Sequence, residues 1–598
     1  MVGNTMRYTS NKGFNIESHD IESTSLQQVR NEIPKLMEDD ADIIVLNLQQ
    51  GLGKSFNAMQ YMSTNSNTMF LTSKHALLDE LEKYFNNENL DTIHWRGISN
   101  NKSPCIQKNT KLFKDLINLG YKANFICEIM ACDYCPYKDQ FKHTERVLAP
   151  IQYLNTNYLE NDEGSRFKTF IVDESITQLN EYPYDLEYLL EVIKPLYHFS
   201  SSWFYEFLQT LLKDKNIIGL ESYKDEISIE IKNTLKTIYT FIDEDNSIES
   251  IESKTWKNDI IHLSKFNIDD IITSLKFQKL YNFEISDWYE PNIYKVFNLA
   301  QKSKIILLHA TFNLDLFKDM LSSYSSEIGI NKTINVKVFN TKLQNKSTKV
   351  YNVNKSAYYP NYSLERGAIN EIGDHVELIA NQIGVKNVGI IGLSKYNKYG
   401  EYVDETFLKT GIDALHFGNS TGRNILEDKQ CLVVAGSWMQ GGIVEEYNKL
   451  YLDKLDEKKC KSLEVDKGTP YTFHPEIHPK LHLVQKVFNE SELLDGMHRN
   501  RGLIHDNRTI VAFSHIPEQI YHDFTVIEDK KIELSDWKDI FPKKETPVYE
   551  LVKDFLENSE LNDYEIAKEL ELRKDDEYDV ELVIRIRKHW NESKEFGI

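Results

Sequence analysis

The sequence predicts an α/β protein with two parallel-sheet units, and three observations support this class. Short apolar runs such as "IIVLN" from Ile43 and "FIVD" from Phe170 end in polar loops. Stretches with helical spacing separate them, as in "TMFLTSKHALLDELEKYF" from Thr68. A second series follows, with "NVGIIGLS" from Asn387 and "CLVVAGSW" from Cys431. Such alternation indicates parallel sheets whose sites lie at the carboxyl ends of the strands.

Length and composition limit the classes of function. The 598 residues are enough for several domains. We expect a cytoplasmic protein without a membrane segment, because neither a long apolar run nor an apolar N-terminal signal region is present. We also expect a monomer. Six cysteines in so long a chain indicate a reducing compartment. The net charge of −22 argues against general adhesion to nucleic acid, so any such binding must be confined to a cleft.

The first apolar run leads into a candidate phosphate-binding loop, Gly51-Leu52-Gly53-Lys54-Ser55. Glycines let backbone N–H groups approach phosphate oxygens, the lysine reaches the β- and γ-phosphates, and the serine hydroxyl reaches Mg²⁺. Leu48 stands where the common motif has its first glycine. The loop predicts ATP and Mg²⁺ as ligands. The alternative is a chance strand–turn–helix that ends in Gly-Lys-Ser.

Asp173 and Glu174 follow the strand "FKTFIV" and form the second candidate motif. In a nucleotide hydrolase, an aspartate at this place holds Mg²⁺ and a glutamate orients or deprotonates the attacking water. Acidic residues at strand ends are also common on surfaces, so the assignment depends on the loop at Lys54.

Arginine is scarce in this lysine-rich chain, yet Arg499, Arg501 and Arg508 lie close together, in and just after "ELLDGMHRNRG". We expect a helix here, with Arg499 and Arg501 directed at a γ-phosphate, because guanidinium groups stabilise the charge that develops there. The alternative is a solvated helix face.

Four of the six cysteines lie within one short segment: Cys105, Cys127, Cys132 and Cys135. Thiolates so grouped in a reducing compartment indicate a metal site, either tetrahedral zinc or an iron–sulfur cluster. The spacing does not choose between the metals, and buried cysteines without a metal are the alternative.

In their order along the chain, these motifs resemble those of the iron–sulfur superfamily 2 DNA helicases, the XPD/DinG-like group. The cysteines fall between Lys54 and Asp173, and the helical stretch "YDLEYLLEVIKPLYHFSSSWFYEFLQTLL" falls between Glu174 and His309. These are the places of that family's cluster insert and arch insert. "HATF" from His309, "HFGNSTGRN" from His416 and "MHRNRG" resemble its later motifs, although Asp495 stands where glutamine is usual.

The resemblance implies two RecA-like P-loop motor domains and an ATP-dependent DNA helicase or translocase with 5′-to-3′ polarity. It implies a [4Fe–4S] cluster on the four cysteines, with zinc as the alternative. Gln27 or Gln28 takes the place of the adenine-side glutamine, of which we assign Gln28, while Ser55 and Asp173 would hold Mg²⁺. Residues implied in DNA contact or coupling are Thr72, Ser73, Thr311, Gly422 and Asn424. The expected partner is single-stranded or forked DNA.

We expect seven consecutive segments. They are motor domain 1 in three parts (1–100, 151–185, 297–345), the four-cysteine insert (101–150), the arch-like insert (186–296), motor domain 2 (346–545) and a C-terminal module (546–598). Two other functions stay open: a DNA-stimulated ATPase that remodels protein–DNA complexes without unwinding, and a P-loop binding module with structural zinc.

The C-terminal module reads as three short helices joined by turns, the pattern of a helix-turn-helix or winged-helix unit. Asn562 or Asp563 can cap a helix with Ile566, Ala567 and Leu570 on one face. A later helix would turn its apolar residues inward (Val580, Leu582, Val583, Ile586) and its basic residues largely outward (Arg585, Arg587, Lys588). The module could bind DNA, or dock a protein partner, as the arch-like insert could too.

Overall fold

The computed structural model describes the greater part of the chain. The described residues are 2–10, 13–21, 25–73, 75–98, 100–110, 134–142, 145–155, 166–173, 179–182, 186–244, 288–328, 332–353, 369–393, 411–417, 425–437, 479–528, 532–542 and 561–570, with single positions or short pieces within 113–132, at 159, within 263–275 and within 552–588. The chain forms two compact units. The first comprises Met1–Asn370 and Gly389–Lys531, and the second comprises Glu371–Val388 and Ile532–Ile598.

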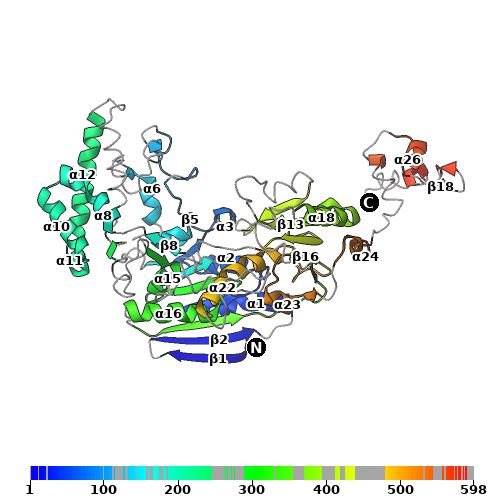
Figure 1. Cartoon of the computed structure of the whole chain (residues 1–598), viewed down its shortest axis with the longest axis horizontal. Helices are drawn as coiled ribbons and strands as arrows, with labels where there is room; N and C mark the ends of the chain where they lie inside the picture. The colour runs from blue at the N-terminus through cyan, green and yellow to red at the C-terminus, as the bar shows by residue number, and fades with distance from the viewer. Residues whose placement is uncertain are drawn as a thin grey trace, which may run out of the picture. The chain divides into compact units, whose positions relative to one another are not determined.

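The first sheet has nine strands in the order β1-β2-β11-β3-β10-β7-β4-β6-β5. Figure 1 shows β1 and β2 side by side at one edge. Their bounds are β1 Val2–Ser10, β2 Phe14–Ile21, β3 Ile43–Asn47, β4 Thr68–Thr72, β5 Ile93–His94, β6 Arg146–Pro150, β7 Thr169–Asp173, β10 Lys304–His309 and β11 Ile334–Asn340. All pairings are parallel except that of β1 with β2. Strands β4, β6 and β7 are buried throughout, which explains their unbroken apolar runs. The predicted parallel sheet is therefore confirmed.

Helices α1 (Leu26–Met37), α2 (Lys54–Thr64), α3 (His75–Asn87), α15 (Asn292–Ala300) and α16 (Leu314–Ile328) accompany this sheet. Helix α1 begins where the Ser25 hydroxyl accepts a hydrogen bond from the backbone N–H of Gln28. The β1–β2 hairpin is an addition that the sequence pattern did not predict, and β2 joins the sheet by pairing with β11.

The second sheet has six strands in the order β14-β13-β15-β16-β12-β17. Their bounds are β12 Lys349–Asn352, β13 Val388–Gly392, β14 Asp413–His416, β15 Cys431–Ala435, β16 Thr509–Phe513 and β17 Thr525–Ile527. The pairings of β12 with β16 and β17, of β13 with β14 and of β15 with β16 are parallel. Two parallel sheets in one chain fit the two RecA-like domains that the sequence predicts. Helices α22 (Pro479–Met497) and α23 (Glu518–Asp523) belong to this half of the unit.

The prediction of one continuous helix through "ELLDGMHRNRG" is wrong in its extent. Helix α22 ends at Met497, so His498, Arg499 and Arg501 lie in the turns after it. Arg501 adopts a positive φ of 55°, which a right-handed helix cannot accommodate. The neighbouring Asn500 is fully buried, and its amide donates to the Thr509 carbonyl.

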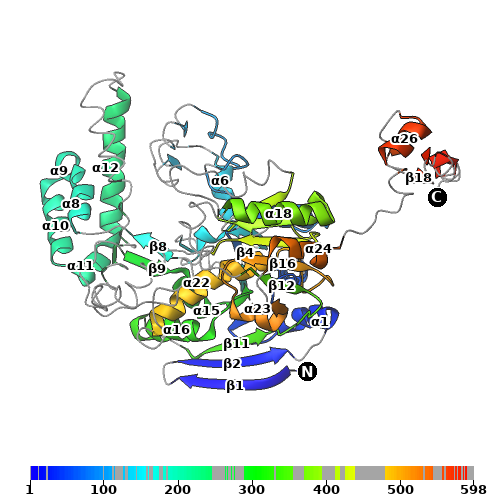
Figure 2. The same cartoon turned by 45° about the vertical axis from the view of Figure 1, so that its right-hand side comes forward.

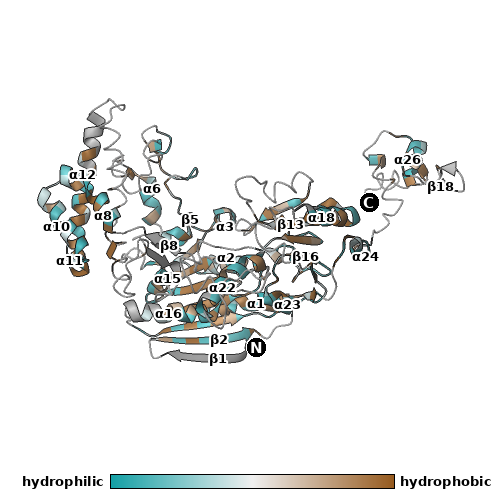
Figure 3. Ribbon diagram, viewed as in Figure 1, coloured by the Kyte–Doolittle hydropathy of each residue, from teal (hydrophilic) through white to brown (hydrophobic). Residues whose placement is uncertain are grey.

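A helical insert follows β7, as the sequence predicts. Its helices are α8 Leu186–Ile193, α9 Pro195–Phe199, α10 Ser202–Lys213, α11 Ile217–Ser222 and α12 Lys224–Glu244, which Figure 2 shows side by side. The short strands β8 (Leu179–Tyr182) and β9 (Trp288–Pro291) pair antiparallel. This ribbon joins the two ends of the insert. Hydrophobic and hydrophilic residues alternate along α8, α10 and α11 in Figure 3, as expected for helices that bury one face.

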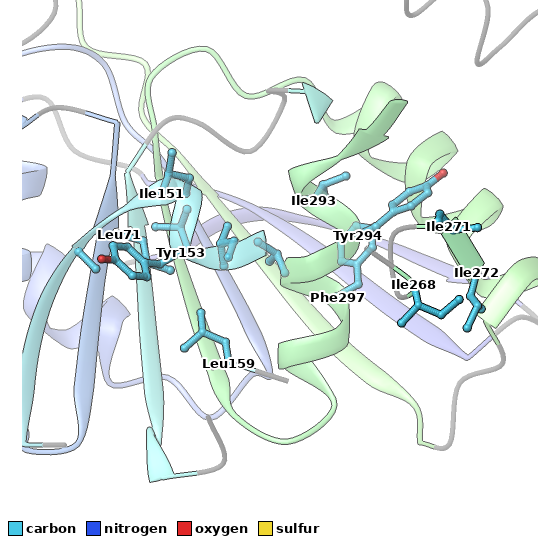
Figure 4. Packing of buried hydrophobic residues seen from close by; sticks show 14 of the residues in the cluster. Leu71, Ile151, Tyr153, Leu159, Ile268, Ile271, Ile272, Ile293, Tyr294 and Phe297 are labelled. Atoms are coloured by element: carbon cyan, nitrogen blue, oxygen red, sulfur yellow. The ribbon is translucent and has the colours of Figure 1, made fainter. Parts of the chain in front are cut away.

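One continuous apolar core connects the first sheet with the inserts. Figure 4 shows Leu71 of β4 and Tyr153 of the 3₁₀ turn Ile151–Asn155, together with Tyr294 and Phe297 of α15. Residues of the cysteine segment belong to the same core, namely Cys105, Phe113, Ile126, Tyr137 and Phe141. The cysteine segment is therefore anchored to the first sheet and is not an independent appendage.

In the second unit, Trp537 of α24 (Trp537–Ile540) donates its indole N–H to His375 of α18 (Ile369–Ile383) over 2.7 Å. The same unit contains the C-terminal module, where α26 (Asp563–Glu569) begins at Asn562 in a reciprocal cap with Glu565. The cap predicted at Asn562 is confirmed.

The predicted polar turn after α26 contains strands. An antiparallel ribbon of β18 (Arg573–Lys574) and β19 (Glu577–Tyr578) takes its place. Val552, Ile566, Ala567, Val583 and Ile586 form a small buried cluster. Arg587 pairs with Asp563 over 2.7 Å, so this basic side chain is held within the module. Leu582 and Arg585 lie outside the described residues.

Candidate functional site

The loop from Gly51 to Ser55 connects β3 to α2, as a phosphate-binding loop requires. Gly51 and Gly53 have φ angles of +83° and +86°, which residues with a Cβ rarely adopt. A Cβ on Gly51 would also lie 2.8 Å from Nη1 of Arg501 and from Cδ1 of Ile504. The glycine at this position thus permits both the tight turn and the close approach of Arg501.

Leu48, at the place of the missing first glycine, has a structural explanation. Its side chain is fully buried in the core cluster that contains Ile44 and Leu46. Its backbone N–H donates to the His309 carbonyl over 2.9 Å, and its carbonyl accepts from Nζ of Lys54 over 2.6 Å. Leu48 therefore continues the strand, and the turn that needs glycine begins only at Gly51.

The loop lines a cavity of about 440 Å³ that collects residues from both sheets. Lys54, Ser55 and Asp173 come from the first sheet and its helix α2. Arg499 and Arg501 come from the turn after α22. The structure thus brings together residues that are more than 400 positions apart in the chain.

Asp173 is 2% exposed and lies at the end of β7, beside β4. Thr72, the last residue of β4, donates from its hydroxyl to the Asp173 carboxylate over 3.3 Å. The carboxylate is thus held at the carboxyl edge of the sheet, facing the same cavity as Ser55. Glu174 lies outside the described residues.

The two arginines of the cavity have acidic neighbours. Arg499 pairs with Asp495, and Asp495 also accepts a hydrogen bond from the Gln50 amide over 2.6 Å. Arg501 lies 3.7 Å from the Glu427 carboxylate. Arg508 is placed elsewhere: it lines a separate open pocket and donates to the Asp428 carbonyl.

Arg30 of α1 is a cavity residue that the motif search did not find. Its guanidinium donates to the Gly51 carbonyl over 3.0 Å. Nε of Arg30 and Nε of Arg499 are both buried and have no hydrogen-bond partner among the described residues. Buried donors without partners are costly, so two of them on one cavity fit an anionic ligand with several acceptor oxygens. Only the scarcity of arginine could have singled out Arg30 from the sequence.

Other predicted site residues lie outside this cavity. Gln28 is exposed on α1 and is not among the described residues that line the cavity. Ser73 is exposed after β4. Thr311 lines a small apolar pocket with Phe312 and Val487. Gly422 and Asn424 lie outside the described residues.

The four cysteines gather around the core of the first sheet. Cys105 is buried in that core, and Cys127 and Cys135 pack against it. Burial, followed by the charge of Cys135, raises the pKa of the Cys127 thiol to about 12, and Cys105 and Cys132 act in the same direction. The four sulfurs are thus close enough to affect one another, although among the described residues no three lie within 4.8 Å.

A set of possible metal ligands lies beside the cysteine segment, and its charge is already balanced. Atoms of Asp79, Glu82 and His94 lie within 4.8 Å of one another. Arg96 pairs with both carboxylates, and Lys102 pairs with Asp79 over 2.7 Å. A cation would have to displace both basic side chains, so we interpret this group as an ion-pair network.

No protein-family model matches the sequence, and no curated protein does. Three solved structures are similar at low identity. A structure described as XPD_APO has 11% identity and a TM-score of 0.39, covering 86% of this chain and 98% of that one. The structure of S. tokodaii Xpd4 has 10% identity and a TM-score of 0.37, covering 84% of this chain and 99% of that one. The structure of the DUF1998 helicase MrfA bound to DNA has 8% identity and a TM-score of 0.28, covering 86% of this chain and 51% of that one. Because every TM-score is below 0.5, these likenesses establish no function, which must be inferred from the chain's own residues.

Within the described part of the chain, no helix combines the length and apolarity needed to cross a membrane.

Proposed function

We propose that this protein is an ATP-dependent motor that acts on single-stranded or forked DNA, with the 5′-to-3′ polarity that the resemblance implies. One observation carries the proposal: Lys54 and Asp173, from the first sheet and its helix α2, line one cavity with Arg499 and Arg501, which follow α22. A nucleotide held between two parallel-sheet domains can couple its hydrolysis to their relative movement. The boundaries given above for two motor domains, a cysteine insert and an arch-like insert belong to this proposal.

The candidate site residues have the following proposed roles. Gly51, Leu52 and Gly53 offer backbone N–H groups to phosphate oxygens, and Lys54 offers its charge to the β- and γ-phosphates. Ser55 and Asp173 would hold Mg²⁺, which neutralises charge on the phosphates when bound. Glu174 would orient the attacking water, and Arg499 and Arg501 would face the γ-phosphate. Arg30 would contact phosphate or sugar oxygens.

The proposed DNA path runs over the carboxyl edges of the sheets. The residues assigned to DNA contact or coupling are Thr72, Ser73, Thr311, Gly422 and Asn424. Thr72 touches the proposed Mg²⁺ ligand Asp173 directly. Asn47 links the "HATF" segment to the loop strand, because its side chain accepts from the Phe312 amide over 3.1 Å. The Thr72–Asp173 contact thus joins the nucleotide cavity to a residue assigned to coupling.

A strand-displacement assay separates unwinding from the second candidate, an ATPase that remodels protein–DNA complexes. We expect ATP-dependent release of a labelled strand from a forked duplex that carries a 5′ single-stranded tail. ATP turnover without strand release would favour the remodelling enzyme.

The four cysteines are proposed to hold one [4Fe–4S] cluster. The donor set fits, because four thiols gather where no disulfide joins them. The preference for a cluster over a single zinc ion rests on the family resemblance, since four thiolates can hold either. Metal binding would deprotonate the thiols, whose pKa values are raised by burial at Cys105 and Cys127.

Metal analysis after anaerobic purification should find about four iron atoms per chain and little zinc. Replacing Cys132 with serine should remove iron, leave ATP binding intact and weaken strand separation. Cys431→Ala is the matched control, since that cysteine is buried in β15, and it should keep its iron. About one zinc and no iron would contradict the cluster and favour a binding module with structural zinc.

The C-terminal module is proposed to bind DNA, with a docking role for a protein partner as the alternative. A chain truncated before Thr546 should keep its basal ATPase and lose affinity for DNA, measured at stated salt because phosphate contacts are salt-sensitive. Lys588 is exposed, whereas Arg587 pairs with Asp563. Lys588→Ala should therefore weaken binding in the full chain. Unchanged affinity in both proteins would leave only the docking role.

A further inference from the structure

Two consecutive glutamines before the phosphate loop donate hydrogen bonds to aspartates that contact the segment with the arginines. Gln49 Nε2 donates to Oδ1 of Asp523 over 2.6 Å. Gln50 Nε2 donates to Oδ1 of Asp495, also over 2.6 Å. Each aspartate contacts one of two consecutive residues in the turn after α22. Asp523 lies 3.1 Å from His498, and Asp495 pairs with Arg499.

Gln49 is fixed on the side of the first sheet. Its amide donates to the Leu343 carbonyl over 2.9 Å and its side-chain oxygen accepts from the Leu343 N–H over 2.9 Å. Its backbone N–H donates to the Thr341 hydroxyl over 3.1 Å. A side chain held at both ends has one orientation, so the position of Gln49 follows that of the loop.

Asp523 is the corresponding fixed point near the second sheet. It is fully buried at the end of α23, where Gln519 and His522 contact the same carboxylate oxygen as Gln49, at 2.7 Å and 3.0 Å. Burial would raise the pKa of Asp523, yet its contacts with His498, His522 and Gln519 hold the pKa below its usual value. Burying a carboxylate costs desolvation free energy, and the contacts with its partners offset this cost.

We propose that Gln49 and Asp523 are positioning residues that set the place of Arg499 relative to the phosphate loop. Gln49, next to the loop, contacts Asp523, and Asp523 contacts His498. His498 immediately precedes Arg499 in the sequence. Asp523 is not among the described residues that line the cavity, so its effect would be exerted through His498. This inference rests on the proposed ATPase function.

Losing the contact should act on the transition state more than on binding. The arginine is needed most where charge develops on the γ-phosphate, and a shift of about 1 Å can lower a rate by up to about 100-fold. ATP binding depends chiefly on the loop and Lys54, which these variants leave in place.

The test measures kcat and KM for ATP in full-length Gln49→Leu, Asp523→Asn and the combined variant, in the presence of single-stranded DNA. We expect kcat to fall about tenfold in each single variant, with KM changed less than about twofold. The combined variant should be no slower than either single one within about twofold, because Gln49→Leu removes the contact that Asp523→Asn weakens. Gln49→Leu keeps a similar side-chain volume, and circular dichroism of each variant checks that it is folded.

Glu518→Ala is the matched control. It breaks an exposed ion pair at 3.0 Å with Lys486, which joins the same helices α22 and α23 outside the buried contact. It should leave both constants unchanged. If the wild-type protein hydrolyses ATP and Gln49→Leu has the same kcat, the positioning role alone is overturned. The same holds if the losses in kcat of the two single variants add in the combined variant. Absence of turnover in the wild-type protein would instead overturn the proposed function together with this inference.

Discussion

Replacing Lys54 with alanine is expected to abolish ATP hydrolysis. The side chain is 7% exposed, lines the cavity at the start of α2 and carries the one positive charge within the loop from Gly51 to Ser55. Its ammonium group donates to the Leu48 carbonyl at the end of the preceding strand, so a bound phosphate would compete with that carbonyl for the charge. Steady-state phosphate release with saturating DNA is the measurement.

Two further variants show whether the loss is specific. Lys342→Ala removes a lysine that pairs with Asp20 and is 61% exposed, and it should keep full turnover. Glu174→Gln should retain nucleotide binding and lose turnover, because its proposed role concerns the attacking water. Normal hydrolysis by Lys54→Ala would refute the assignment of the phosphate loop.

Replacing Arg499 or Arg501 with alanine is expected to lower the rate of hydrolysis by about 10³-fold, the typical effect of removing an arginine from a transferred phosphoryl group. Both line the cavity that contains Lys54. Arg499 is paired with Asp495 in the structure, so a γ-phosphate would have to compete with that carboxylate.

Arg508→Ala is the matched control for these variants. Arg508 belongs to the same cluster in the sequence, but it lines a separate pocket and bonds to the Asp428 carbonyl. Its loss should leave the rate within about twofold, as for a residue without contact to the reacting groups. If Arg499→Ala and Arg501→Ala also hydrolyse ATP normally, the arginines take no part in the reaction.

The local features of the fold could be predicted from the sequence because they depend on neighbouring residues. Buried strands such as β3 and β7 read as unbroken apolar runs, and the turn after β3 reads from its two glycines. The cap at Asn562 needs only Glu565 three residues later. Leu48 looked like a defect in the motif, but it is a core residue of the strand.

Features that depend on distant partners could not be predicted. The contact between Gln49 and Asp523 joins positions 474 residues apart, and neither residue belongs to a motif. The β1–β2 hairpin joins the sheet through β11, more than 300 residues away in the chain. The end of α22 at Met497 follows from the positive φ of Arg501 and the buried Asn500, which no local spacing indicates.

ATP turnover by the full-length protein, measured with and without single-stranded DNA, tests the central claim most directly. The cavity between loop and arginines predicts hydrolysis that depends on Mg²⁺, rises when single-stranded DNA is added and disappears in Lys54→Ala. Turnover that is absent with every DNA, or that persists unchanged in Lys54→Ala, would contradict the claim that this cavity drives a DNA motor.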